Sequence, residues 1–232
     1  MPKPFSTWTV LPHRPIEKLA DNLWRVSGMM GQVQRQMVVG RMRDGGLLID
    51  NAIALDDAEM KELEAWGRPT FLVVPNGYHR QDAAIWKARY PQLKVIAPPR
   101  GRKRVAKVVP VDLTTDEAPG DETVKVVPIA GSASDTLVQI RSGDDVTLVF
   151  CDTILNVPKR TGPVGFMLAP TGRVSVPRAA RWMMIQDKRA LAAQLEELAA
   201  LPGLRRVLVG HGAPITADPA GALRSVVEQL RA

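Results

Sequence analysis

The chain has 232 residues, of which 45% are hydrophobic and 24% are charged, and its formal net charge is +7. This composition predicts one sizeable folded domain over residues 1–232 and excludes a wholly disordered chain. The single cysteine excludes an intramolecular disulfide, and no apolar run approaches the roughly 20 residues of a membrane-spanning helix. Because the N-terminus lacks a signal-peptide pattern, we expect a cytoplasmic protein that starts with an extended segment over residues 1–15.

The first half of the chain predicts short strands that alternate with helices. Apolar, β-branched runs bounded by glycine, proline or aspartate indicate strands at residues 23–26, 36–40, 47–51, 71–74 and 94–97. One helix is expected over residues 56–66, where Asp56 and Glu59 form a cap-like pattern. A second is expected over residues 83–90, which end before Pro91. The elements from residue 71 onward therefore predict a βαβ unit.

The second half predicts three further strands, a long irregular segment, and a final strand between two helices. The strands are expected at residues 124–127, 136–140, 146–150 and 206–209, and the helices around residues 194–200 and 220–230. Prolines and glycines after Asp152 predict a long loop, and such loops are typical of functional or partner-binding segments. Strands and helices alternate in both halves, which favours two packed sheets with helices outside.

Four segments resemble the metallo-β-lactamase superfamily, and the resemblance runs from about Ile16 to the C-terminus. These segments are residues 19–26, 46–50, 150–153 and 209–215. In the resemblance, Asp50 ends the strand that supports the metal loop, Asp152 is the bridging aspartate, and His211 is the histidine of a late Gly-His-Gly loop. The resemblance implies a single-domain, mixed α/β, four-layer αβ/βα sandwich.

The central metal motif of that superfamily, His-x-His-x-Asp-His, does not match this sequence. An ungapped alignment after residues 71–74 places at its positions Asn76, Tyr78, Arg80 and Gln81. A shift of one residue places His79 at the second histidine, and at the other positions Gly77, Gln81 and Asp82. The next family histidine follows a glycine, but here Gly131 is followed by Ser132. The resemblance therefore implies a divergent branch with a degenerate metal site.

The number of histidines limits the metal chemistry. A dinuclear zinc site of this type uses about five histidines plus carboxylates, whereas the chain contains only His13, His79 and His211. Our first interpretation is therefore a metallo-β-lactamase-like protein without dinuclear hydrolase activity and without a resident cofactor. It would act by binding, for example to a small molecule, and its catalytic residues stay unassigned.

The second interpretation is a mononuclear zinc site formed by His79, Asp152 and His211. Two imidazoles, one carboxylate and a water satisfy tetrahedral zinc and suit hydrolysis of a small ester, lactone or thioester. Asp50 or Asp82 would then orient a histidine. Each ligand also has a structural alternative: a residue beside a helix start for His79, an acceptor of backbone N–H groups in a turn for Asp152, and a backbone-bonded loop residue for His211.

The third interpretation is a basic module that binds an anionic partner such as nucleic acid. It rests on a cluster formed by Arg100, Arg102, Lys103, Arg104 and Lys107. Aromatic residues make up only 5% of the chain and none lies within this cluster, although nucleic-acid binding usually adds stacking side chains. The alternative is a solvated helix face.

Other residues give smaller expectations. Cys151 follows an apolar strand and is expected to pack in the core, and Ser132 lacks the Gly-x-Ser-x-Gly elbow of a nucleophile. The apolar run at residues 181–185 favours core packing, with a homodimer contact or a lid over the site as alternatives. A guanidinium at Arg80 would repel a bound dication, so we expect it to pair with Asp152 instead.

Overall fold

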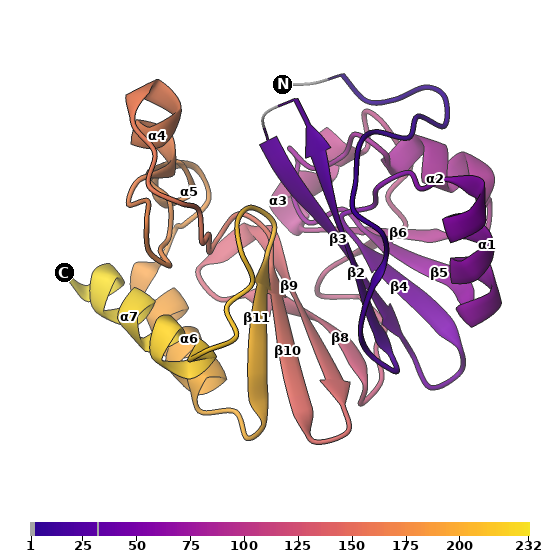
Figure 1. The fold of residues 1–232 in the computed structure, drawn as a ribbon. Helices are drawn as coiled ribbons and strands as arrows, with labels where there is room; N and C mark the ends of the chain where they lie inside the picture. The colour runs from indigo at the N-terminus through magenta and orange to yellow at the C-terminus, as the bar shows by residue number, and fades with distance from the viewer. Residues whose placement is uncertain (1–2, 32) are drawn as a thin grey trace.

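The protein is described by a computed structural model that covers residues 3–31 and 33–232. Within these residues, seven strands form one sheet and four strands form a second. The sheets lie against each other, and helices cover the outer side of each (Figure 1). The predicted four-layer αβ/βα sandwich is therefore confirmed. Met1 and Pro2 of the predicted extended segment lie outside the described residues, and no helix of the described part is long and apolar enough to cross a membrane.

The larger sheet has the strand order β1-β2-β3-β4-β5-β6-β7 and comes from the first half of the chain. Its antiparallel part is formed by β1 (Glu17–Ala20), β2 (Leu23–Met30), β3 (Val33–Arg41) and β4 (Gly46–Asp50). Its parallel part continues from β4 into β5 (Arg68–Val73), β6 (Lys94–Ala97) and β7 (Leu113–Thr114). The parallel crossovers run through α1 (Asp57–Trp66), α2 (Ala83–Arg89) and α3 (Pro99–Val105). As predicted, the backbone N–H of Glu59 donates to Asp56 at the start of α1.

The smaller sheet has the order β11-β10-β9-β8. Its members are β8 (Val124–Ile129), β9 (Ser132–Ser142), β10 (Asp145–Phe150) and β11 (Leu204–Val209). β8, β9 and β10 form an antiparallel meander, whereas β11 pairs parallel to β10. Its outer side is covered by α6 (Lys188–Ala199) and α7 (Pro219–Arg231) (Figure 1).

Alternating side chains divide the interior into three apolar layers, because successive residues of a strand point to opposite faces. In β4, Leu48 joins the layer between the sheets, while Leu47 and Ile49 pack under the helices of the first half. In β10, Val149 enters the central layer, whereas Leu148 packs under α6 and α7. Buried on both faces, these strands are nearly continuous apolar runs, which is why their positions were predictable.

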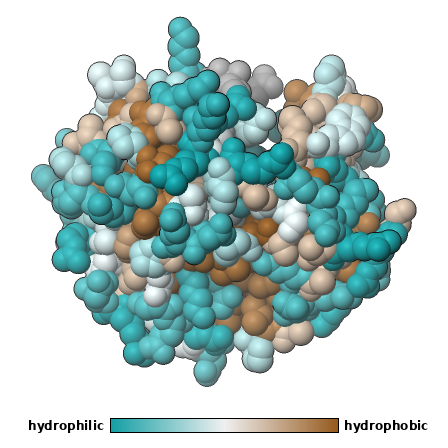
Figure 2. Space-filling model, turned by 180° about the vertical axis from the view of Figure 1, so that it is seen from behind, coloured by the Kyte–Doolittle hydropathy of each residue, from teal (hydrophilic) through white to brown (hydrophobic). Residues whose placement is uncertain are grey.

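The segment predicted as a long loop contains two short helices, α4 (Gly162–Leu168) and α5 (Arg178–Met183). We call residues 162–183 the flap. Trp182 is 65% exposed and Met183 is 52% exposed, so the predicted core packing is wrong for both, although Met184 is buried. Phe166 is also exposed, with the guanidinium of Arg178 4.0 Å from its ring centroid. Viewed from behind, the surface is mostly hydrophilic, with hydrophobic side chains gathered at the upper left and in the lower centre and paler ones at the upper right (Figure 2).

Replacing Leu48 by alanine tests the packing between the sheets. The side chain is fully buried in the central layer. We expect the free energy of unfolding to fall by about 2–5 kcal/mol, because the substitution removes apolar contacts and leaves a cavity. Urea unfolding of Leu48→Ala and of Val164→Ala, which truncates an exposed flap residue, would measure this. Equal midpoints for the two variants would contradict a packed layer at Leu48.

Candidate metal centre

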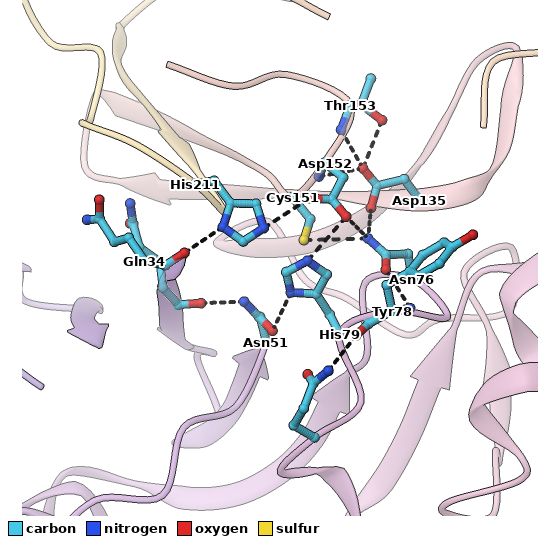
Figure 3. A network of polar contacts seen from close by, with 12 residues as sticks. Gln34, Asn51, Asn76, Tyr78, His79, Asp135, Cys151, Asp152, Thr153 and His211 are labelled. Carbon is cyan, nitrogen blue, oxygen red and sulfur yellow. Dashed lines mark hydrogen bonds and ion pairs between the residues drawn. The ribbon is translucent and has the colours of Figure 1, made fainter. Parts of the chain in front are cut away.

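The candidate centre lies at one end of the sandwich, where strand ends from both sheets meet. Asn51 follows β4, a loop with Asn76 and His79 follows β5, Asp152 follows β10, and His211 follows β11. Sheets with parallel strands commonly bind ligands beyond the carboxyl ends of those strands. Figure 3 shows these side chains directed toward one another.

Three of these side chains surround one carboxylate. His79 Nε2 lies 3.2 Å from Asp152 Oδ2, and His211 Nε2 lies 3.3 Å from Asp152 Oδ1. The centroids of the two imidazole rings are 5.1 Å apart. The side chains of His79, Asp152 and His211 are 11%, 20% and 17% exposed, so solvent still reaches the group. The fold thus brings together the three residues that the sequence proposes as metal ligands.

The other ring nitrogen of each histidine faces an oxygen that can only accept a hydrogen bond. His79 Nδ1 lies 3.1 Å from Asn51 Oδ1, and His211 Nδ1 lies 2.5 Å from the carbonyl oxygen of Gln34. Asn51 Nδ2 donates to the carbonyl oxygen of Gln36, which leaves Asn51 Oδ1 as the acceptor for the imidazole. Both Nδ1 atoms therefore donate, so without a metal each Nε2 can pair with the shared carboxylate only through the N–H of a protonated ring, and a metal ion would take the place of that proton.

A second carboxylate, Asp135, holds the loop after β10 in place. Its Oδ2 atom accepts from the backbone N–H of Asp152 at 3.0 Å, and from the N–H and hydroxyl of Thr153, each at 2.8 Å. The sequence offered, as the alternative to metal binding, that Asp152 accepts backbone N–H groups in a turn. In the structure Asp135 is the residue that accepts these groups. Asn76 completes the network by donating from Nδ2 to Asp152 Oδ2 at 2.9 Å (Figure 3).

The buried acids of the centre have opposing pKa shifts. Burial alone would raise the pKa of Asp152, but the imidazoles of His79 and His211 hold it well below the usual range. Burial alone would lower the pKa of His211, but the hydrogen bond to Asp152 raises it. Burial and the charge of Asp152 raise the pKa of Asp135 to about 6, and burial with the charge of Asp135 raises that of Asp50 well above normal. Burial and mutual repulsion therefore disfavour ionisation of Asp50 and Asp135, whereas Asp152 stays ionised between the two imidazoles.

Two backbone conformations allow this convergence. Asn51 has a positive φ of 54°, a conformation in which asparagine is several-fold enriched. Gly212 has a φ of 106°, and a Cβ atom there would lie 2.1 Å from the carbonyl oxygen of Asn156. Only glycine therefore lets the loop of His211 pass so close to Asn156.

These side chains fit one metal ion. In the part of the chain that the structure describes, His79, Asp152 and His211 form the one group of three histidine, cysteine or acidic residues with ligand atoms all within 4.8 Å of one another. Two imidazole nitrogens and a carboxylate are a common donor set for zinc, with a fourth position left for water. Their Nδ1–H groups already bond to fixed acceptors, as metal-binding histidines usually do.

Two solved structures with similar folds are both metallo-β-lactamases. The structure of DIM-1 metallo-β-lactamase exposed to ceftazidime matches with a TM-score of 0.61 and 15% identity, over 95% of this chain and 99% of that chain. A metallo-β-lactamase from Hirschia baltica matches with a TM-score of 0.55 and 12% identity, over 92% and 98% of the two chains. This chain has the metallo-β-lactamase fold. No family model matches its sequence, and a comparison with curated proteins finds no match.

Several expectations about neighbouring residues of this metallo-β-lactamase fold are wrong. Asp82 orients no histidine: it accepts from the guanidinium of buried Arg35 and from the backbone N–H of Ala54. Asp50 is buried, and its Oδ1 atom has no hydrogen-bond partner among the described residues. Asn51 and the Gln34 carbonyl take the orienting role instead. Asparagine after a strand is a common turn residue, so no sequence pattern pointed to Asn51.

Arg80 also differs from expectation. It donates to the carbonyl oxygen of Arg104 at 2.7 Å, so the expected pair with Asp152 is not formed. The third histidine, His13, pairs elsewhere: its side chain is 9% exposed and its Nε2 lies 3.4 Å from Glu59 Oε2. Cys151 is buried, as predicted.

The basic cluster lies on and just after α3, beside the loop of His79. The guanidinium of Arg104 stacks 4.3 Å from the ring centroid of Tyr78, and the Tyr78 hydroxyl lies 3.9 Å from Met183 Sδ on the flap. An aromatic residue distant in sequence is thus in contact with the cluster. Nucleic-acid binding by this cluster stays a prediction.

A cleft of about 880 Å³ borders the His211 side of the centre. Its lining includes Gln34, whose carbonyl oxygen binds His211, and Gly212, which follows that histidine. Its other walls come from the N-terminal segment, the β2–β3 hairpin, the start of the long loop and the segment after His211; they include Pro12, Arg14, Met29, Val157 and Pro214. The cleft therefore combines apolar side chains with polar and charged ones, among them Glu17 and Arg25.

Replacing Asn51 by alanine tests whether the Nδ1 partner orients His79. The variant removes the acceptor of His79 Nδ1, and loss of such a partner typically lowers metal affinity about 10- to 100-fold. Competition with a zinc-binding dye on untagged protein would measure the affinity. Asn22→Ala, which truncates an amide bonded to Arg141 and Ser142, is the control. Equal affinities in the two variants would contradict the orienting role.

Proposed function

We propose that this protein is a mononuclear zinc hydrolase of a small ester, lactone or thioester. One observation carries the proposal: two imidazole Nε2 atoms, each with its Nδ1–H committed elsewhere, face the same carboxylate. The similar solved structures support the choice of zinc and of hydrolysis through the shared fold alone, because their identities are only 15% and 12%. The chain's three histidines support one ion over two.

In this proposal His79, Asp152 and His211 hold the ion. When bound, zinc supplies a Lewis acid and a water that ionises near neutral pH. Asn51 and the Gln34 carbonyl keep each imidazole in the tautomer that presents Nε2. Asp135 fixes the backbone of the loop from which the Asp152 side chain projects. These residues prepare the geometry in advance, so little reorganisation is needed when substrate arrives.

The cleft beside His211 is the proposed substrate site. Its volume of about 880 Å³ suits a small molecule, and its proline, valine and methionine side chains suit an apolar acyl group. Arg14 is exposed at its edge and could meet a negatively charged end of the substrate. The cleft thus favours a small substrate over a polymer.

Metal analysis tests the ion. Untagged protein, purified with trace zinc, is expected to hold about one zinc per chain, because three ligands and a solvent position complete a tetrahedral site. His211→Ala and His79→Ala are each expected to lose it, whereas His13→Ala should keep it, since His13 pairs with Glu59 away from the centre. Elemental analysis with protein quantification gives the ratio. Zinc-free wild-type protein, even after dialysis against micromolar zinc, would refute the proposal.

Hydrolysis of short-chain esters, lactones and thioesters tests the activity. Wild-type protein is expected to act on at least one class, to lose activity on chelation and to regain it with zinc. Met29→Trp narrows the cleft at an exposed position, so KM should rise while zinc content stays unchanged. Initial rates over a range of substrate concentrations would show this. A zinc-loaded protein inactive on all three classes would favour the alternative of a metal-containing binding protein.

A further inference from the structure

The flap carries most of the large apolar side chains that are exposed in the described part of the chain. Five of these eight residues lie there: Val164, Phe166, Met167, Trp182 and Met183. Figure 1 shows α4, which holds the first three, projecting beyond the ends of the strands. Exposed apolar area that gathers on one projecting segment indicates a contact surface.

The packing of α5 holds this apolar face outward. Ala180 and Met184 are buried in the layer under α6 and α7. They lie four residues apart on one side of the helix, so Trp182 points to the other side. The ring centroids of Phe166 and Trp182 are 6.3 Å apart, and the Arg178 guanidinium lies 4.0 Å and 5.9 Å from them. The outward face is therefore preformed.

Positive charge is concentrated in the same part of the chain. Between Asp152 and Asp187 the sequence has no acidic residue. The cations of this stretch are Lys159, Arg160, Arg173, Arg178 and Arg181. None of them forms an ion pair within residues 3–31 and 33–232. Burial, together with the charges of Arg173 and Arg178, lowers the pKa of Arg181, so these cations lie close enough to repel one another. An anionic partner would relieve this repulsion.

The combination of apolar and cationic side chains selects the chemistry of the partner. Aliphatic side chains such as Val164 and Met167 match hydrocarbon, whereas a nucleic acid would call for stacking rings along the surface. Two copies of this chain packed flap to flap would bring like charges together. Tryptophan and phenylalanine beside basic residues are typical of surfaces that enter the boundary between lipid headgroups and acyl chains.

We propose that the flap anchors this protein reversibly to an anionic lipid surface. The apolar side chains of α4 and Trp182 enter the headgroup boundary, and the cations around them bind lipid phosphates. Arg160 lies against α4, since a Cβ atom at Gly165 would be 2.5 Å from its carbonyl oxygen. Such a contact needs no membrane-spanning helix. It goes beyond the proposed hydrolase and does not depend on the metal centre.

Co-sedimentation of untagged protein with vesicles tests the apolar part of the anchor. We expect binding to vesicles of phosphatidylcholine mixed with phosphatidylglycerol, weaker binding at high salt, and little binding to phosphatidylcholine alone. Phe166→Ser/Trp182→Ser should lower the affinity at least about 10-fold, because two rings no longer leave water. Val10→Ser/Val33→Ser, which changes two exposed valines outside the flap, is the control and should bind as wild type does.

Charge reversal tests the electrostatic part. Lys159→Glu/Arg160→Glu should also lower the affinity for the mixed vesicles at least about 10-fold, because each basic residue near the surface adds to the attraction. Arg100→Glu/Lys103→Glu makes the same change in net charge at two exposed residues of α3. This control should lower the affinity less.

Trp182→Phe shows whether the flap itself enters the lipid. Brominated lipids should quench the tryptophan fluorescence of bound wild-type protein. The variant should still bind, because it keeps an apolar ring, but should lose most of the quenching. The other tryptophans pack in or against the apolar layer of the first half.

Each outcome supports or overturns the lipid anchor, provided that Tm shows each variant to be folded. Wild-type protein that ignores the anionic vesicles overturns it. Binding that the flap variants and their controls weaken equally also overturns it, because net charge alone would then explain the attraction. A dimer or an RNA complex that Phe166→Ser/Trp182→Ser abolishes, without vesicle binding by wild type, assigns the flap to another partner. Repeating the assay with a chelator separates these results from the zinc hypothesis.

Discussion

The side chain of Asp152 is the constraint on which the centre depends. A mostly buried carboxylate is costly unless its oxygens are paired, and removal of one partner from such a group costs about 3–5 kcal/mol. Here each oxygen faces one imidazole Nε2, and one of them also accepts from Asn76. The partners follow β5 and β11, which belong to different sheets. Satisfying one carboxylate therefore ties together the ends of both sheets.

The positions of His79, Asp152 and His211 also depend on residues around them. Each imidazole can present Nε2 only if Nδ1–H has an acceptor, and the chain supplies these from β3 and from the residue after β4. Asp135 in β9 fixes the loop of Asp152 through three donors. Six strands, β3, β4, β5, β9, β10 and β11, therefore contribute to the position of three side chains. Rigid strand ends hold such a group more precisely than mobile loops would.

The sequence predicted the framework better than the site. Strands such as β6 and β10 are nearly continuous apolar runs buried on both faces, so the sequence pattern alone revealed them. His79, Asp152 and His211 could be proposed because few residue types bind zinc. Asn51 and Asn76 could not, because asparagine after a strand is equally typical of turns. Asp135 lies within β9 and belongs to no motif that the sequence offered. Trp182 was misassigned because hydrophobicity does not show whether a loop folds back onto the core.

The fold and the site depend on different features of the sequence. This explains how one chain can have the metallo-β-lactamase fold without the central metal motif. The sandwich requires alternating apolar residues of suitable volume, which very different sequences can supply, so the fold is matched at 15% identity. The centre requires particular donors at particular strand ends, and a single exchange alters its chemistry. At position 76 a neutral amide faces carboxylates where the resemblance places a metal-binding histidine. The chemistry of this end of the sandwich therefore depends on the side chains at the strand ends, independently of the apolar layers that position them.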